Sequence, residues 1–454
     1  FTLLTLVIVY LLARHLITSN FSQVLAVLIF LFNPLVIQGS LLIDIDNSTL
    51  MFFIALFVYA YLKLDRSQLK NLLALGILFA LSLWSKISTP PMLLLGIFIF
   101  HTLNGEHKKG LRESAIIGVI GSLIFLATWF LYCNILKLPF WLPFLRNIGY
   151  INTGAGITHF LLTHLWGFKN ILFWATPFFL FLLFVVFIAR ASLYYEYKKA
   201  VSFDFLVIVG LLIFFEYIIV GSYQTQDFPK YFVPMMPLFS VVFAGYVIMR
   251  VNDFTGKDVH TVVLVSIIII VYSLLLLGDP LLIDRVILNT LFLQQIVEET
   301  ALVSMLYVLP LVISYMIFRV LKVKNAFILS LIVPLLLCSV YIDVLQVKAD
   351  YATGYFYGES GMKDMMDYLR PQINACEVVI AREDVAYYLG VKEFYRLPEN
   401  PEELSKLIEN KDVRYIVISK GGYFTTLAYA EVFESIESKY KLEKDFGDFK
   451  IYRG

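Results

Sequence analysis

The sequence predicts a polytopic α-helical membrane protein, with about twelve transmembrane helices followed by a C-terminal α/β domain. Three observations support this fold class. Of the 454 residues, 59% are hydrophobic and only 16% are charged, whereas soluble domains carry about 25% charged residues. Long apolar runs recur as far as residue 345. After residue 350, charged residues return and short β-rich segments appear. We therefore expect lipid to surround the first part of the chain.

The helical domain is placed at residues 1–348 and the α/β domain at 349–454. A spanning helix needs about 20 apolar residues. The runs that meet or approach this length are 1–13, 21–40, 49–63, 71–85, 90–102, 114–136, 171–189, 203–221, 232–249, 260–278, 301–318 and 326–345. The short runs 71–85 and 90–102 could form one broken hairpin or two full spans.

Lys and Arg concentrate in alternate gaps between these runs, and such gaps face the cytoplasm. The cation-rich gaps carry Arg14, then Lys63, Arg66 and Lys70, then Lys108, Lys109 and Arg112, then Arg190, Lys198 and Lys199, then Arg250 and Lys257, then Arg319, Lys322 and Lys324. The other gaps, including the 222–231 loop, are predicted to face outward together with the C-terminal domain. This makes a multi-pass protein of the cell membrane with an extracytoplasmic C-terminal domain. Because residues 1–13 then run inward, we expect a helix and an outward loop before Phe1.

The C-terminal segment alternates strand-like and helix-like patterns. The expected strands are Cys376–Ala381, Glu393–Leu397, Val413–Ser419 and Phe449–Arg453, and the expected helices are Gly361–Leu369, Pro401–Glu409 and Leu427–Tyr440. Asn400 before Pro401 predicts a helix N-cap. The domain has no GxGxxG or GKS/T pattern, so a nucleotide site has no support, and the net charge of +1 gives no reason to expect a nucleic-acid partner.

Two carboxylates, Asp44 and Asp46, stand at the outward mouth of two apolar runs. A carboxylate near hydrocarbon costs several kcal/mol, on the order of 3. One acid is explained as a cap, because Asp46 or Asn47 can open the helix that starts near Thr49. The second acid is left over, which makes this pair a candidate for chemistry.

Cations and another acid also approach the predicted outer surface. Lys86 follows a short apolar run, and Asp227 precedes Lys230 and Tyr231 at the start of another. An ammonium there could bind a phosphate, although snorkelling to headgroups and an aromatic-basic membrane belt explain the same residues. Glu216 lies within an apolar run, where an acid is either functional or makes a helix-packing hydrogen bond.

Taken together, these segments resemble the GT-C glycosyltransferases that use polyprenyl-phosphate sugars, the group of the protein O-mannosyltransferases and the lipid A aminoarabinose transferase. The stretch from Asp46 to Phe53 resembles that family's second outward acidic motif. Ser82–Pro90 is similar to its Leu-Leu-Thr-Lys-x-Pro segment, with Ser85 for Thr and the proline displaced. Lys230–Pro237 is similar to its Arg-Tyr-x-x-Pro-x-x-Pro segment, with Lys for Arg.

The resemblance implies a membrane glycosyltransferase that moves a sugar from dolichyl or undecaprenyl phosphate to a protein, lipid or glycan at the outer face. It implies that Lys86, Lys230 and Tyr231 bind the donor phosphate. The family's catalytic Asp belongs to the first outward loop, which would precede Phe1, so Asp44 or Asp46 otherwise takes its role. These two acids could hold a divalent cation, but relatives differ in metal use and no cofactor is fixed.

Two other classes stay open on the sequence alone. A transporter of a lipid-linked or polar substrate would favour polar residues in mid-membrane and internal repeats; Glu216 is the one acid found in mid-run, and no convincing repeat is present. A non-catalytic membrane scaffold would account for the absence of a catalytic Asp. Transfer of oligosaccharide to asparagine lacks its Trp-Trp-Asp-Tyr-Gly signature in residues 350–454.

Overall fold

The computed structural model describes residues 1–33, 35–37, 45–141, 177–217, 229–251, 267, 316, 361–374, 376–398, 400–419, 430–446 and 449–453. The chain divides into two compact units, Phe1–Asp343 and Val344–Gly454. The domain boundary predicted at 348/349 lies outside the described residues, and so does nearly all of the three apolar runs predicted after residue 259.

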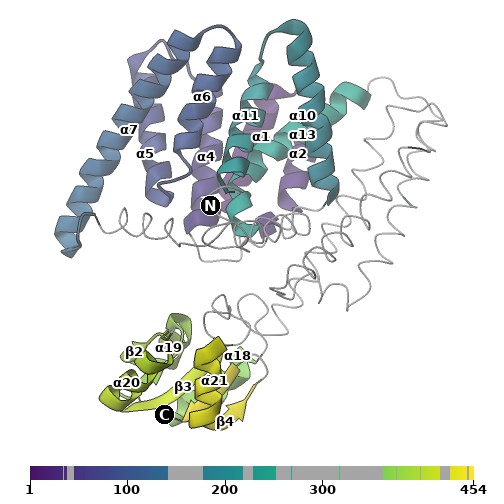
Figure 1. Ribbon diagram of the computed structural model, residues 1–454. Coiled ribbons are helices and arrows are strands. Elements are labelled where there is room, and N and C mark those ends of the chain that lie inside the picture. The colour runs from purple at the N-terminus through teal and green to yellow at the C-terminus, as the bar shows by residue number, and fades with distance from the viewer. Residues whose placement is uncertain are drawn as a thin grey trace. The chain divides into compact units, whose positions relative to one another are not determined.

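The first unit is helical, and each of the first nine predicted runs contains a helix (Figure 1). Its described elements are α1 (Thr2–Leu16), α2 (Asn20–Leu31), α4 (Ile45–Lys63), α5 (Leu69–Ser85), α6 (Pro91–Leu103), α7 (His107–Leu136), α10 (Pro177–Tyr197), α11 (Ser202–Glu216), η2 (Pro229–Met235) and α13 (Met236–Val251). The runs 71–85 and 90–102 form two separate helices, α5 and α6. Among the described helices, α7 alone is long and apolar enough to cross a membrane.

Helix α7 packs along α5 and α6 through small residues. A Cβ built on Gly121 would lie 2.7 Å from the carbonyl oxygen of Gly76 and 2.6 Å from Cδ1 of Phe79. A Cβ on Gly76 would lie 2.5 Å from Cγ2 of Ile120. The two glycines therefore let the backbones of α5 and α7 approach closely, which is how helices commonly associate in lipid.

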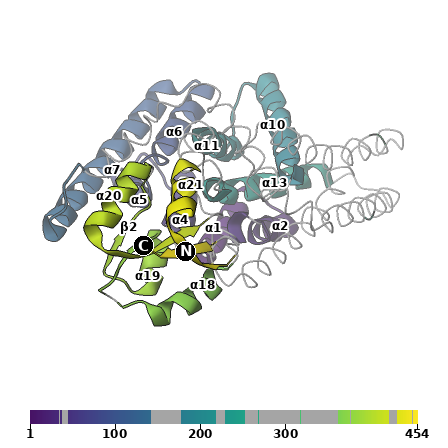
Figure 2. The same ribbon diagram turned by 60° about the horizontal axis from the view of Figure 1, so that its bottom comes forward.

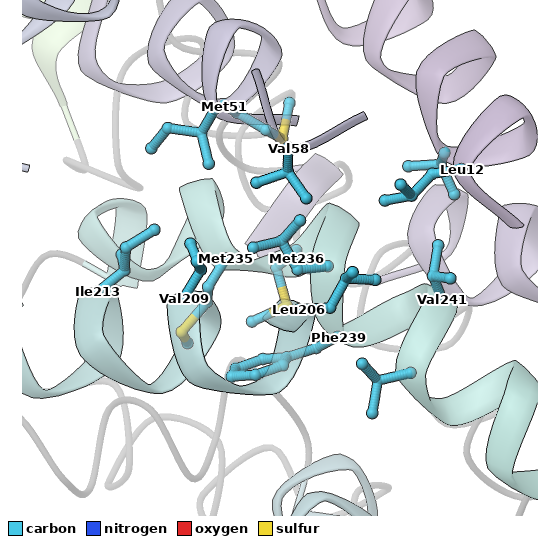
Figure 3. Packing of buried hydrophobic residues seen from close by; sticks show 14 of the residues in the cluster. Leu12, Met51, Val58, Leu206, Val209, Ile213, Met235, Met236, Phe239 and Val241 are labelled. Atoms are coloured by element: carbon cyan, nitrogen blue, oxygen red, sulfur yellow. The ribbon is translucent and has the colours of Figure 1, made fainter. Parts of the chain in front are cut away.

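The core of this unit forms where α4, α11, η2 and α13 meet. Figure 3 shows Met51 of α4, Val209 of α11 and Met236 of α13 in this core. All three side chains are buried. Since η2 contacts both α4 and α11, the segment that carries Lys230 and Tyr231 is fixed against the helices that carry Asp46 and Glu216.

The far side of α7 is apolar and exposed. Val119, Leu123, Phe130 and Leu131 are each at least 58% exposed. A contiguous apolar face of this kind is unfavourable in water. It is what a helix presents to lipid.

A partly buried ion pair connects α10 with the first turn of α11. The guanidinium of Arg190 donates to both carboxylate oxygens of Asp204, from Nε over 2.6 Å and from Nη2 over 2.8 Å. Asp204 also accepts from the backbone N–H of Val201 over 2.8 Å, which caps α11. The two hydrogen bonds of this bidentate pair hold α10 against the first turn of α11.

The second unit is a mixed five-stranded sheet in the order β2-β1-β3-β5-β4. Its elements are α18 (Met362–Leu369), η4 (Arg370–Gln372), β1 (Val378–Ile380), α19 (Glu383–Leu389), β2 (Glu393–Tyr395), α20 (Pro401–Lys411), β3 (Val413–Ser419), α21 (Ala430–Lys439), β4 (Lys441–Asp445) and β5 (Phe449–Arg453). Strands β2, β1 and β3 are parallel, and β5 is antiparallel to both β3 and β4.

Helices cover both faces of this sheet (Figure 2). Tyr415 and Val417 of β3 pack under α18 and α19, whereas Ile416 and Ile418 pack under α20 and α21. This alternation follows from the two-residue period of a strand. The predicted N-cap is present, since the side chain of Asn400 accepts from the backbone N–H of Glu402 over 2.8 Å.

Candidate functional site

Four polar side chains from three elements meet where α5 ends and α6 begins. Lys86 directly follows α5, Thr89 precedes α6, and Glu216 and Tyr217 stand at the end of α11. The ammonium of Lys86 lies 4.9 Å from the ring centroid of Tyr217, within cation–π range. The structure thus brings together two residues singled out in the sequence, Lys86 and Glu216, with Thr89 and Tyr217 between them.

A hydrogen-bond chain connects the hydroxyl groups with the acid. The Thr89 hydroxyl donates to Oε1 of Glu216 over 3.3 Å, and the oxygens of Thr89 and Tyr217 lie 2.6 Å apart. Because a hydroxyl has one proton to donate, Thr89 accepts from Tyr217 when it donates to Glu216. Thr89 is fully buried, and Glu216 and Tyr217 are nearly so, so these bonds form away from water and hold the groups firmly.

Local sequence explains why Lys86 leaves the helix at this point. Lys86 is the C-cap of α5 and has extended backbone angles. Pro90 and Pro91 then open α6, where a missing N–H has no cost. The short segment between the two helices presents Lys86 and Thr89 on the same side as the end of α11.

The segment similar to the family's Arg-Tyr-x-x-Pro motif lies beside this cluster. The ring of Phe232 in η2 stands 6.0 Å from that of Tyr217 and 5.6 Å from that of Phe214, measured between centroids. Only the backbone of Lys230 and Tyr231 is described. Lys230 and Tyr231 directly precede Phe232 in η2.

The structure describes the other predicted acidic residues only in part. Asp44 and Asp227 lie outside the described residues. Asp46 belongs to the first turn of α4, but its side chain is not described. Since α4 and α5 are joined by a short loop and contact each other, the start of α4 lies at the same end of the bundle as Lys86.

A second buried polar cluster lies at the other end of α6, between α6, α4 and α7. Tyr61 donates to Oε2 of Glu113 over 2.8 Å, and its hydroxyl oxygen lies 2.9 Å from Nε2 of His101. Nε of Arg66 lies 3.1 Å from the same Glu113 oxygen, and the guanidinium stacks over the Tyr61 ring. Nδ1 of His101 reaches Glu106, 2.9 Å away. This cluster joins α4, α6 and α7 by polar contacts.

The exposed edge of the second cluster carries one further ion pair. Lys109 donates to Glu106 over 3.0 Å. This bond, together with the His101 ring, lowers the pKa of the Glu106 carboxyl.

Among the described side chains, no group of three or more His, Cys, Asp or Glu residues is arranged so that it could hold a metal ion. The divalent cation considered for Asp44 and Asp46 remains a prediction, because neither side chain is described.

Two comparisons show which known proteins this chain is similar to. Residues 1–132 match the family described as dolichyl-phosphate-mannose-protein mannosyltransferase. A crystal structure of ArnT from Cupriavidus metallidurans, bound to undecaprenyl phosphate, matches with a TM-score of 0.55 at 12% sequence identity. The match covers 99% of this chain and 82% of that one. The chain therefore shares the overall fold of ArnT.

The resemblance predicted from the sequence is thus confirmed. The matched residues 1–132 include the positions of Asp44, Asp46 and Lys86. A search of curated proteins found no match.

Thr89 and Tyr217 were not predicted from the sequence. Both types are common at the ends of apolar helices, and neither carries a charge that would draw attention. A weak signal was present, because Tyr217 follows Glu216, the acid in the middle of its apolar run, and Thr89 precedes two prolines.

Proposed function

We propose that this chain is a membrane glycosyltransferase that moves a sugar from a polyprenyl phosphate, dolichyl or undecaprenyl, to an acceptor at the outer face. The acceptor is a protein, a lipid or a glycan. The observation that carries the proposal is the ammonium of Lys86, held over the Tyr217 ring at the predicted outer end of the bundle. The family described for residues 1–132 names a dolichyl-phosphate donor, and ArnT is bound to undecaprenyl phosphate.

The position of Lys86 suits a lipid-linked phosphate. The prenyl tail of such a donor stays in the hydrocarbon, so its phosphate must lie at the membrane interface. As the bond between sugar and phosphate breaks, negative charge grows on the leaving phosphate, and a fixed cation stabilises that charge. We assign this role to Lys86, with Lys230 and the phenol of Tyr231 as additional donors from η2.

A base must take the proton of the acceptor hydroxyl when that oxygen attacks the anomeric carbon. We assign this role to the acids at the start of α4, Asp44 and Asp46, because that end of α4 and Lys86 share one end of the bundle. We propose Asp227 as a further polar group at the same end of the bundle. We propose that Glu216 contributes indirectly, through its hydrogen bond with Thr89.

A transfer assay on the purified protein in lipid nanodiscs tests the proposal. The donors are dolichyl phosphate mannose and undecaprenyl phosphate sugars. Lys86→Met should lower the rate of transfer about 100-fold or more, as removal of one electrostatic stabiliser does in other enzymes. Asp46→Asn should lower it by a similar factor if this carboxylate is the base.

Lys63 provides a matched control. Its ammonium also lies over a tyrosine ring, that of Tyr59, at a centroid distance of 5.2 Å, but it is exposed and stands at the opposite end of α4. Lys63→Met should leave transfer unchanged. Wild-type transfer by Lys86→Met would overturn the proposal, and substrate flux across proteoliposomes without sugar transfer would favour a transporter.

A further inference from the structure

We propose that His101 carries a proton on both ring nitrogens and that this imidazolium is a pH-sensitive lock, which holds α6 to α4 and α7 at the predicted cytoplasmic end of the bundle. The proposal concerns the second polar cluster and does not depend on sugar transfer. It follows from the protons that the hydrogen bonds on the two nitrogens require.

The His101 side chain is enclosed by protein. It is 3% exposed and belongs to the last turn of α6. The ring of Phe100 lies 5.6 Å from it, measured between centroids. A Cβ built on Gly110 would lie 2.7 Å from Cβ of His101, so the first turn of α7 passes directly against it. Water therefore has little access to the ring, and protein groups must supply its hydrogen-bond partners.

Nε2 of His101 must donate, because Tyr61 has already used its one proton. The Tyr61 hydroxyl donates to Oε2 of Glu113 over 2.8 Å. That oxygen belongs to an ionised carboxylate, since Nε of Arg66 lies 3.1 Å from it and an arginine is always charged. Nε2 of His101 is 2.9 Å from the Tyr61 oxygen. This contact is a hydrogen bond only if Nε2 carries the proton.

Nδ1 of His101 must donate as well, because it faces a second carboxylate. It lies 2.9 Å from Oε2 of Glu106. Lys109 donates to the same oxygen over 3.0 Å, and this hydrogen bond is the main cause that lowers the pKa of Glu106. Glu106 is therefore ionised near neutral pH and can only accept. With protons on both nitrogens, His101 is an imidazolium.

A neutral His101 would leave one of these contacts unfavourable. With the proton on Nε2, the lone pair of Nδ1 would face the Glu106 carboxylate at 2.9 Å. With the proton on Nδ1, Nε2 would accept from Tyr61, and Glu113 would lose the hydrogen bond from that hydroxyl. The helix dipole also favours a cation at this place, because His101 stands in the last turn of α6.

Loss of one proton should loosen the junction of three helices. The described ionisable side chains that face His101, directly or through one of its partners, are Tyr61, Arg66, Glu106, Lys109 and Glu113. Helix α11, which also packs on α6, brings the apolar ring of Phe205 against Phe100. The imidazolium is thus the cation that two carboxylates share. When it becomes neutral, this attraction is lost and α6 is held less firmly to α4 and α7.

Solid-state NMR of the full chain in lipid bilayers, with 15N-labelled histidine, tests the protonation of His101. The chain has six histidines, and the signal of His101 is the one that is absent in His101→Gln. As the pH rises, His101 should keep both ring protons after the exposed His15 and His107 have each lost one. Loss of the proton at the same pH as in His15 and His107 would overturn the inference.

Glu106→Gln removes the charge beside Nδ1 from a half-exposed position. It should move the loss of the His101 proton to lower pH by about one pH unit or more, the effect of removing a nearby opposite charge. Asp65→Asn is the matched control, because Asp65 is an exposed acid at the same end of the bundle that bonds to Ser67. It should leave the titration of His101 unchanged. Equal effects of the two variants would contradict the proposed contact.

Thermal unfolding at different pH values tests the lock. Below the pH at which His101 loses its proton, the wild type should have a higher Tm than His101→Gln. Above that pH the difference should narrow, because a group that binds its proton more tightly in the folded state stabilises the fold only while it is protonated. A difference that stays the same on both sides would overturn the inference. If His101→Gln does not fold, Glu106→Gln replaces it in both experiments, and the His101 signal is then the one that moves.

Discussion

Glu113 is the residue on which the second polar cluster depends. Its carboxylate accepts a hydrogen bond from the Tyr61 hydroxyl and lies close to both Arg66 and His101. The side chains of Glu113 and His101 are 5% and 3% exposed. Removing one partner of such a buried group leaves the others without compensation, which costs far more than the loss of a surface pair.

Glu113→Ala should therefore lower the free energy of unfolding by about 3 kcal/mol. Glu113→Gln keeps an acceptor for Tyr61 and should lose less. Thermal or denaturant unfolding of the purified protein in detergent measures both changes.

Glu106→Ala is the matched control for this prediction. Glu106 bonds to the same His101 from an exposed position, so its loss should destabilise the protein less than Glu113→Ala does. Equal stability of Glu113→Ala and the wild type would show that the cluster does not hold the helices together.

Among single residues of the candidate site, the charged ones are the easiest to predict from the sequence. Lys86 and Glu216 were found because a charge in an apolar setting is costly and therefore informative. Thr89 and Tyr217 were missed because their role depends on which helices become neighbours, and the two residues are 128 positions apart in the sequence. Long-range packing of this kind has no local pattern.

Among the elements, helices were easier to predict than edge strands. For the described helices of the first unit, each apolar run predicted a helix, although α7 begins at His107 before its run and α10 extends to Tyr197 beyond its run. Strand β4 was missed because it pairs only with β5 and its residues Lys441–Asp445 are largely exposed and charged, a pattern that protects sheet edges from aggregation. Helix α19 was missed because its short sequence has only three buried apolar residues, Val385, Ala386 and Leu389.

The contact between α5 and α7 gives a prediction for an element. Gly121→Ala would place its Cβ against backbone, 2.7 Å from the Gly76 carbonyl oxygen. Backbone cannot move aside as a side chain can, so the variant should lose about 1–3 kcal/mol of unfolding free energy. Thermal unfolding in detergent measures the loss.

Gly118→Ala in the same helix provides the control. Its Cβ would meet only Cδ1 of Leu94, at 2.9 Å, the flexible end of a side chain. Both changes bring the same gain in helix propensity, about 1 kcal/mol, so the difference between them reports packing alone. Equal stability of the two variants would contradict the close approach of α5 and α7.

For the whole molecule, composition alone predicts the division into a helical part and a small α/β part. The mixed order of the sheet, with β5 inserted between β3 and β4, could not be predicted because it depends on a strand that was missed. The fold class was predictable from the composition and the length of the apolar runs, and the weak motifs added the family resemblance.

The central claim is that Lys86 binds the phosphate of a lipid-linked donor at one end of the helical bundle. A cryo-electron microscopy structure of the chain with undecaprenyl phosphate in nanodiscs tests it most directly. We expect a phosphate oxygen about 2.7–2.9 Å from Nζ of Lys86, the distance of a charge-assisted hydrogen bond, with the prenyl chain in lipid. A phosphate bound elsewhere, with Lys86 in contact only with protein or bulk lipid, would contradict the claim.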